Sequence, residues 1–189
     1  MSRYKGKKAE VTRSLILESA ARLFAKYGVS EVSISKIMAD VGLTNGGFYK
    51  YFDSKEMLAI EVCDLAFGKI QGTWEVHSAR ARQTSEDPYR YLVRQYLSSA
   101  VAGECALVAL SLDAVGVSDE KLLSQLYCKG TKALLNTLLR VSLESGSTRT
   151  RDDVLVHFAA MLGTALLCRT PSSGKWVQEV EMALSNQLG

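Results

Sequence analysis

Apolar residues recur at helical spacing along most of this chain, and no segment shows sustained two-residue alternation. A period near 3.6 residues gathers apolar side chains on one face of a helix, whereas a half-buried strand needs a period of two. The strongest pattern lies between about Lys8 and Tyr27, and Gly28 follows it as a helix stop. The sequence therefore predicts an all-α fold of about nine helices.

Two short helices are expected next, on either side of a glycine turn. Ser33 can cap the first of them, and Gly42 permits the backbone angles of a tight turn. Thr44 is then the candidate N-cap of a helix over about residues 45–51. Together with the first helix they form a three-helix unit of the kind that presents its last helix to DNA, although similar hairpins occur in structural bundles.

The remaining helices are expected to form a larger C-terminal part. Asp53 and Glu56 are spaced as a capping box for a long helix that continues to about Arg80. After a polar break over residues 82–88 the helical pattern resumes. The later helices are predicted over residues 89–100, 105–115, 119–144, 151–169 and 174–187. The predicted domains are residues 1–53 and residues 54–189.

Positive charge is concentrated near the N-terminus of the sequence. Residues 1–55 hold ten Lys/Arg against five Asp/Glu, a net of +5, whereas residues 56–189 hold thirteen against fifteen, a net of −2. This asymmetry favours a polyanionic partner for the first third, although a charged run is also typical of a solvated surface. The basic arm at residues 3–8 is either a solubility tail or a source of non-specific phosphate attraction.

Several function classes are not supported by the residues present. We expect a cytoplasmic protein with no membrane partner, because no apolar stretch follows the basic N-terminus as a signal or spanning segment would require. Two histidines eighty positions apart, four scattered cysteines and the lack of a phosphate-binding glycine loop predict no enzyme, no metal site and no cofactor.

Residues 42–58, GLTNGGFYKYFDSKEML, resemble the recognition-helix signature of TetR-family regulators. Residues 16–28 and 33–38 resemble the first and second helices of that family. Residues 46–49, with residues 103–107, further resemble a subgroup that has a Gly-Gly-Phe-Tyr recognition helix, except that Tyr51 replaces its frequent histidine. The resemblance implies a transcription regulator, a repressor released from a palindromic operator by a small-molecule inducer, with ligand binding and dimerisation in the C-terminal domain.

The paired glycines of this segment favour DNA contact on independent grounds. Each glycine in a helix costs roughly 1 kcal/mol relative to alanine, and close backbone approach to DNA is a use that offsets this cost. Asn45 and Lys50 suit base edges, whereas Tyr49 and Lys55 suit phosphates. The predicted DNA-binding residues are Ser33, Thr44, Asn45, Gly46, Gly47, Phe48, Tyr49, Lys50 and Lys55. Ser33 and Thr44 could be caps only, and Phe48 and Phe52 could belong to the core.

An inducer pocket is expected among the middle helices, lined by apolar residues with a few polar ones. The candidate ligand-binding residues are Trp74, His77, Tyr96, Cys105, Tyr127, His157 and Met161, each of which could equally be a packing residue. Cys105 is expected near a helix N-terminus, where the helix dipole favours a thiolate. The alternatives are therefore a regulator that senses an electrophile or oxidant through Cys105, and a helical interaction module that binds no DNA.

The last two helices are expected to form a homodimer interface. Small residues on the first of them allow close helix approach, and apolar residues on the second form a stripe at helical spacing. The small residues are Ala159, Ala160, Gly163 and Ala165, and the stripe is Val177, Val180, Leu184 and Leu188. Two such helices from each subunit make a four-helix bundle, and the alternative is a core within one chain.

Overall fold

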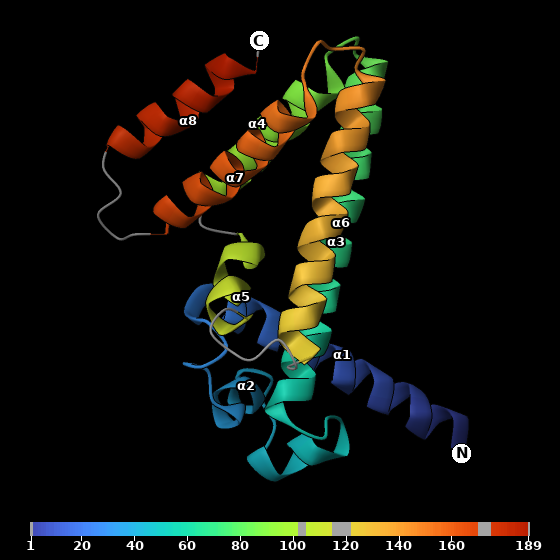
Figure 1. Ribbon diagram of the computed structural model, residues 1–189. Coiled ribbons are helices and arrows are strands. Elements are labelled where there is room, and N and C mark those ends of the chain that lie inside the picture. Colours follow the sequence, from blue (N-terminus) through green and yellow to red (C-terminus); the bar gives the residue numbers. More distant parts are fainter. Residues whose placement is uncertain (1, 102–104, 115–121, 170–174, 189) are drawn as a thin grey trace. The chain divides into compact units, whose positions relative to one another are not determined.

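The computed structural model describes residues 2–101, 105–114, 122–169 and 175–188, and within these ranges it is helical without any strand (Figure 1). Nine helices lie in the described ranges, which confirms the predicted all-α fold. They are α1 (Ser2–Tyr27), α2 (Ile34–Asp40), the 3-10 helix η1 (Asn45–Lys50), α3 (Lys55–Gln83), α4 (Pro88–Val101), α5 (Ala106–Ala114), α6 (Leu122–Glu144), α7 (Arg151–Leu167) and α8 (Lys175–Gln187).

Most predicted helix bounds lie within a few residues of the observed ones, with two larger differences. Helix α1 begins at Ser2 instead of near Lys8. The added segment contains Arg3, Lys5 and Lys7, and arginine and lysine are good helix formers, so the helix extends beyond the apolar pattern that predicted it. Helix α3 continues to Gln83, into the predicted polar break. The predicted bounds at residues 115, 119 and 174 lie outside the described residues.

The chain divides into two compact units. The first, here called the N-terminal unit, comprises Met1–Ala66 and Ala109–Lys129, and the second, the C-terminal unit, comprises Phe67–Val108 and Gly130–Gly189. Helices α3, α5 and α6 each contribute residues to both units. The domain boundary expected between residues 53 and 54 falls in the turn before α3. It stays a prediction of where DNA binding ends and ligand binding and dimerisation begin.

Helices α3 and α6 lie side by side within the C-terminal unit (Figure 1). The Gln71 amide donates to the Thr137 hydroxyl at 2.6 Å, and Arg140 pairs with Glu75 at 2.5 Å. Gly130 permits this close approach, because a Cβ at that position would lie 2.4 Å from the ring of Phe67. Helix α4 packs on α7 and α8 in the same unit.

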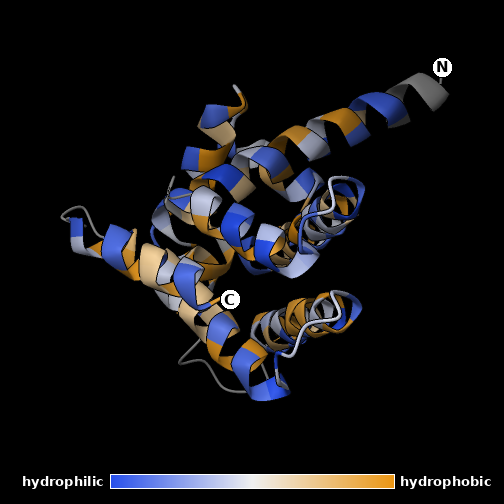
Figure 2. Ribbon diagram, turned by 90° about the horizontal axis from the view of Figure 1, so that it is seen from above, coloured by the Kyte–Doolittle hydropathy of each residue, from blue (hydrophilic) through white to orange (hydrophobic). Residues whose placement is uncertain are grey.

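Hydrophilic and hydrophobic residues are interspersed along the helices (Figure 2). Among the described residues no helix combines the length and the apolar character that a membrane crossing requires. The apolar residues instead form buried clusters, of which the one in the N-terminal unit positions the candidate site.

Candidate nucleic-acid interface

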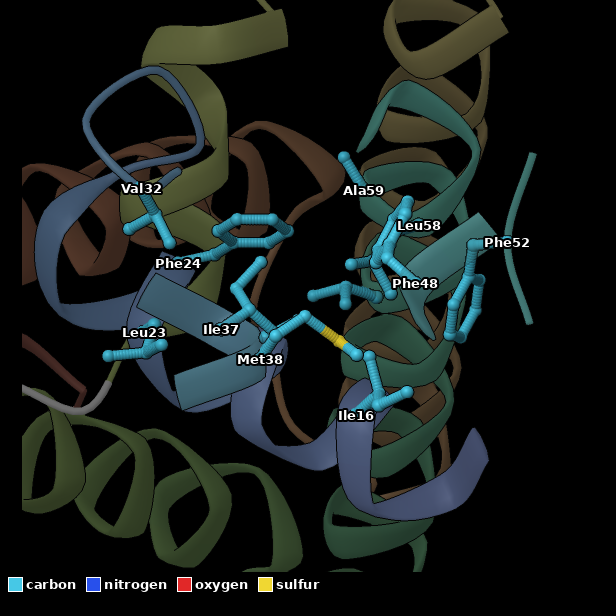
Figure 3. Close-up of a cluster of buried hydrophobic side chains, with 12 residues drawn as sticks. Ile16, Leu23, Phe24, Val32, Ile37, Met38, Phe48, Phe52, Leu58 and Ala59 are labelled. Atoms are coloured by element: carbon cyan, nitrogen blue, oxygen red, sulfur yellow. The ribbon is translucent and has the colours of Figure 1, made fainter. Parts of the chain in front are cut away.

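A cluster of buried apolar side chains holds the first helices of the N-terminal unit together. Ile16 and Phe24 of α1 meet Ile37 and Met38 of α2, and Phe48 of η1 joins them (Figure 3). All five side chains are fully buried. Because each helix contributes to one core, the exposed face of η1 is held rigidly relative to α1 and α2.

The turn between α2 and η1 has the geometry that Gly42 makes possible. Gly42 has φ +70°, a left-handed conformation that residues with a Cβ rarely adopt. Its amide donates to the carbonyl of Ala39 at 3.0 Å, and the amide of Leu43 donates to the carbonyl of Met38 at 2.8 Å. The predicted glycine turn between two short helices is confirmed.

The two predicted caps in this region have different outcomes. Ser33 caps α2, since its hydroxyl accepts the amide of Lys36 at 3.2 Å, as predicted. Thr44 precedes η1, but its hydroxyl makes no capping hydrogen bond. The reason is the tighter 3-10 turn, in which the amide of Gly47 donates to the Thr44 carbonyl at 3.0 Å.

The exposed face of η1 carries most of the predicted DNA contacts. Asn45, Gly46 and Lys50 are exposed, and the Tyr49 ring is 65% exposed. A Cβ at Gly46 would meet nothing within 4 Å, and one at Gly47 would make only ordinary contact with Met38. Packing among the described residues therefore does not require this glycine pair, so it does not explain their conformational cost.

Phe48 does not belong to this exposed face. Its side chain is fully buried and stacks on Phe52 with ring centroids 5.7 Å apart. Among the residues of η1, Phe48 is the one that is buried, and it turns inward onto Met38 and Leu58 (Figure 3). Phe48 was predicted to contact DNA, but in this structure it is a core residue. Phe52 is also buried, which agrees with the core role proposed for it.

The start of α3 differs from the expected capping box. The Ser54 hydroxyl accepts the amide of Met57 at 3.1 Å, whereas Asp53 is exposed at the preceding position. The helix begins at Lys55, so the N-cap falls on Ser54, one residue later than predicted. The ammonium of Lys55 lies 3.4 Å from the carbonyl oxygen of Ser30, on the loop before α2.

Polar pairs that the sequence patterns did not reveal brace this unit. The guanidinium of Arg13 bonds both carboxylate oxygens of Glu61, at 2.5 and 2.7 Å, and lies 4.4 Å from the ring centroid of Phe52. Asp40 accepts from the hydroxyl of Ser19 at 2.5 Å and from Arg22. Only the folded arrangement brings these distant residues together, so no local signal could have identified them.

A further basic cluster lies where α1 meets α2. The ammonium of Lys36 sits 3.8 Å from the ring centroid of Tyr27, and that of Lys26 sits 5.1 Å from it. A hydrogen bond from Lys26 and its charge, together with the charge of Lys36, lower the pKa of Tyr27. All three side chains are exposed, and they add positive charge beside the caps of α2.

The predicted ligand residues do not form one set. Trp74 and Tyr96 meet edge to face with centroids 6.1 Å apart, and the Tyr96 hydroxyl lies 3.1 Å from the Cys105 sulfur. His157 is buried elsewhere in the C-terminal unit, with its Nδ1 2.8 Å from the hydroxyl of Tyr89. Trp74, Tyr96 and Cys105 are therefore connected by successive contacts, with Tyr96 in the middle.

The remaining predicted ligand residues are Met161, His77 and Tyr127. Met161 is buried on α7. His77 is half-buried against Tyr91 with ring centroids 5.8 Å apart, and burial lowers its pKa. Tyr127 is half-buried and belongs to the N-terminal unit. Which of these residues touch a ligand stays a prediction.

The predicted dimer stripe on α8 is largely used within the chain. Val177, Leu184 and Leu188 are buried, because α8 packs on α4 and α7. Other apolar side chains of the last two helices face outward in this single chain. They are Val156 and Leu166 on α7 and Trp176 and Met182 on α8, between 48% and 64% exposed.

This arrangement is that of a helix-turn-helix unit with an exposed basic face. The other described elements of the chain are also helices. Residues 16–62 match the family model described as bacterial regulatory proteins, tetR family. This segment is therefore similar to the N-terminal domain of that family. No finding distinguishes the Gly-Gly-Phe-Tyr subgroup.

Similar proteins are found among curated sequences and solved structures. The HTH-type transcriptional regulator AcrR of Shigella flexneri is 37% identical over 70 residues, which is 37% of this chain and 33% of that protein. The first curated relatives are matched over about a third of their length or less.

Two solved structures show the fold of the whole chain. A TetR-family transcriptional regulator from Cytophaga hutchinsonii has a TM-score of 0.72 at 20% identity, covering 95% of this chain and 94% of that one. The regulator AibR, solved with isovaleryl coenzyme A and operator DNA, has a TM-score of 0.61 at 17% identity, covering 93% and 96%. The described chain thus has a TetR-like fold.

Proposed function

We propose that this protein is a DNA-binding transcription regulator that reads its operator with η1. The observation that carries the proposal is the glycine pair of η1, Gly46 exposed and Gly47 partly buried, which internal packing does not require. The exposed Asn45 and Lys50 lie on the same helix. A flat backbone surface flanked by an amide and an ammonium suits close entry into a major groove. The family match of residues 16–62 supports the same reading.

The polar residues divide into two roles. Asn45 and Lys50 would contact base edges, where an amide pairs with adenine and an ammonium with guanine. Thr44, Tyr49 and Ser33 would contact phosphates and fix the register of the protein on the duplex. Lys55 joins this second group if its ammonium leaves the Ser30 carbonyl, which lies at 3.4 Å, for a phosphate of higher charge.

A homodimer would double this surface. The outward apolar residues Val156, Leu166, Trp176 and Met182 are the candidates for its interface, and they replace most of the stripe first predicted. A two-fold dimer presents two η1 helices and so requires a palindromic operator with half-sites about one helical turn, roughly 34 Å, apart. Light scattering on the free protein tests this: a monomer at micromolar concentration would contradict it.

We infer further that the protein is a repressor released by a small-molecule inducer that binds the C-terminal unit. The structural neighbour AibR was solved with both a coenzyme A ester and operator DNA, which supports a two-ligand scheme for this fold. An effective inducer needs to bind the DNA-free conformation roughly ten- to a hundredfold more tightly than the DNA-bound one. The adjacent Trp74, Tyr96 and Cys105 are the first residues to test.

A thiol sensor is the second candidate, favoured by the contact between Cys105 and the Tyr96 hydroxyl. Covalent attack on the sulfur by an electrophile would break this contact. The test is Cys105→Ser, titrated with an electrophile while the protein is bound to DNA. Unchanged release by the variant would leave Cys105 as a packing residue and favour a non-covalent inducer.

The central experiment is a gel-shift titration of the full chain with duplexes from the DNA flanking its own gene. We expect one duplex to be bound in the presence of excess random DNA, and Asn45→Ala with Lys50→Ala to abolish that preference. Lys69→Ala is the matched control, because Lys69 is exposed and lies in the C-terminal unit. Equal affinity for all duplexes by the parent protein would refute operator recognition, and no binding at all would favour the interaction-module alternative.

A further inference from the structure

Asp113, near the end of α5, binds the loop between α1 and α2. Its Oδ2 accepts the amide of Val29 at 2.7 Å, and its Oδ1 accepts the amide of Ser30 at 3.0 Å and the hydroxyl of Ser30 at 2.6 Å. One carboxylate thus receives three hydrogen bonds from two consecutive residues that lie 83 and 84 positions earlier. All of these atoms belong to the N-terminal unit.

The loop is shaped to receive this carboxylate. Gly28 ends α1 with φ +84°, and a Cβ built there would lie 3.4 Å from the Oδ2 of Asp113. The left-handed turn leaves the next two amides pointing outward, where a charged acceptor can take both. On its other side Ser30 offers its carbonyl to Lys55, so this one residue connects the loop to both α5 and α3.

The position of Asp113 on its own helix is otherwise unfavourable. A carboxylate in the last turn of a helix faces the negative end of the helix dipole. Hydrogen bonds to a charged acceptor are stronger than neutral ones, and three of them compensate for that placement. The carboxylate is therefore better explained by the loop that it holds than by the helix that carries it.

We propose that Asp113 is a positioning residue for DNA binding, which fixes the loop before α2 and so the helices that follow it; this rests on the proposed function. The held loop leads directly through Ser33, the cap of α2, to the helix that η1 follows.

The sign of one substitution separates this role from simple charge. Asp113→Asn removes a negative charge, and by electrostatics alone this would strengthen binding to a polyanion. We expect the opposite, a loss of about tenfold or more in operator affinity, because the amide cannot accept the same three bonds. Asp64→Asn is the matched control: Asp64 is exposed in the same unit, and its loss should leave affinity equal or slightly higher.

Hydrogen exchange followed by NMR tests the contact without DNA. The amides of Val29 and Ser30 should exchange slowly in the parent and about tenfold faster in Asp113→Asn, while Asp64→Asn changes neither. Ser30→Ala should have a smaller effect than Asp113→Asn, since it removes one bond of three. Unchanged exchange of both amides in Asp113→Asn would overturn the proposal.

A separate measurement distinguishes failure of this proposal from failure of the proposed function: whether the parent protein selects any duplex from a random-sequence pool. A parent that selects no duplex refutes the proposed function, while the DNA-free exchange still decides whether Asp113 holds the loop.

Discussion

The contacts that stabilise the interior of the N-terminal unit differ in kind from those inside the C-terminal unit. In the N-terminal unit one fully apolar cluster lies under the helices, and its ion pairs, such as Arg13 with Glu61, are about a third or more exposed. In the C-terminal unit polar groups reach the interior: Tyr89 and His157 are buried and bonded to each other, and Arg149 is 12% exposed. Apolar burial tolerates changes of pH, whereas buried polar networks depend on the protonation of each member.

The largest effect is expected from Phe48→Ala, which tests the apolar half of this comparison. Removing a fully buried phenylalanine costs about 3–5 kcal/mol, a large part of the stability of a small unit. We expect DNA binding to be lost and hydrogen exchange to accelerate throughout the N-terminal unit. Phe158→Ala, the matched cavity in the C-terminal unit, should instead loosen residues around α7. If either substitution melts the whole chain in one step, the units are not energetically separate.

Arg149→Met addresses the polar half of the comparison. The Arg149 guanidinium bonds Asp87 and the carbonyl of Leu188 at 3.1 Å, and it lies 4.3 Å from the ring centroid of Tyr89. The substitution leaves the Asp87 carboxylate, which is 26% exposed, without its cation. We expect the free energy of unfolding to fall by about 2–3 kcal/mol, less than for a fully buried pair because solvent screens the remaining charge. Urea denaturation measures the loss, and Arg151→Met, an exposed arginine nearby in sequence, serves as the control.

The same pair predicts how acid acts on the C-terminal unit. Burial opposes ionisation of Asp87, but hydrogen bonding and charge from Arg149 dominate and lower its pKa. A lowered folded pKa contributes stability that is complete above the unfolded value, about 3.9, and is lost as pH falls through the folded value. Arg149→Met should therefore lose less stability than the parent below about pH 4. Parallel stability curves for the two proteins would show that Asp87 gains nothing from Arg149.

Smaller effects are expected on the exposed DNA-binding face, where Lys50 and Lys55 should differ. Lys50→Ala should lower affinity for the operator by about 1–3 kcal/mol and relax base preference. Lys55→Ala should weaken binding to all duplexes alike and reduce the slope of affinity against salt by about one unit. Fluorescence anisotropy over a range of salt concentrations distinguishes them. Identical losses with unchanged slopes would mean that the two roles are wrongly assigned.

The sequence predicted the fold where local rules determine it. Helical spacing and the left-handed position of Gly42 are properties of neighbouring residues, so α2, its Ser33 cap and the turn were all predicted. The predicted N-cap of α3 was wrong by one residue. Ser54 caps the helix in place of Asp53, because its hydroxyl reaches the amide of Met57. Near a helix start several short polar residues satisfy the same rule, and packing decides among them.

Much of the candidate site depends on residues that are far apart in the sequence. Phe48 has neighbours that suit DNA contact, and only the folded core shows that it packs under them. Asp113 is one of many acidic residues in the sequence, and its importance comes from amides 83 and 84 positions earlier. The stripe on α8 was correctly read as apolar, but periodicity does not state which surface covers it.

The smallest predicted effect, and the sharpest test of the comparison, is the titration of His157. Burial lowers its pKa, the charge of Arg149 acts in the same direction, and Asp153 opposes them. Burial also raises the pKa of Tyr89, so the phenol keeps its proton, and its hydroxyl lies 2.8 Å from the Nδ1 of His157. A histidine whose pKa is lower in the folded state binds fewer protons there, so stability is complete above about pH 6.5 and falls as pH drops towards the folded value. The loss cannot exceed about 1.4 kcal/mol per pH unit for one proton.

His157→Gln should flatten the dependence of Tm on pH between 7.5 and 5.5, whereas His77→Gln, at the half-buried histidine, should flatten it less. Protection factors in the N-terminal unit, which correct for the intrinsic pH dependence of amide exchange, should not change over this range. A fall in these factors at Val29 or Ser30 on acidification would show that the two units share one titrating network.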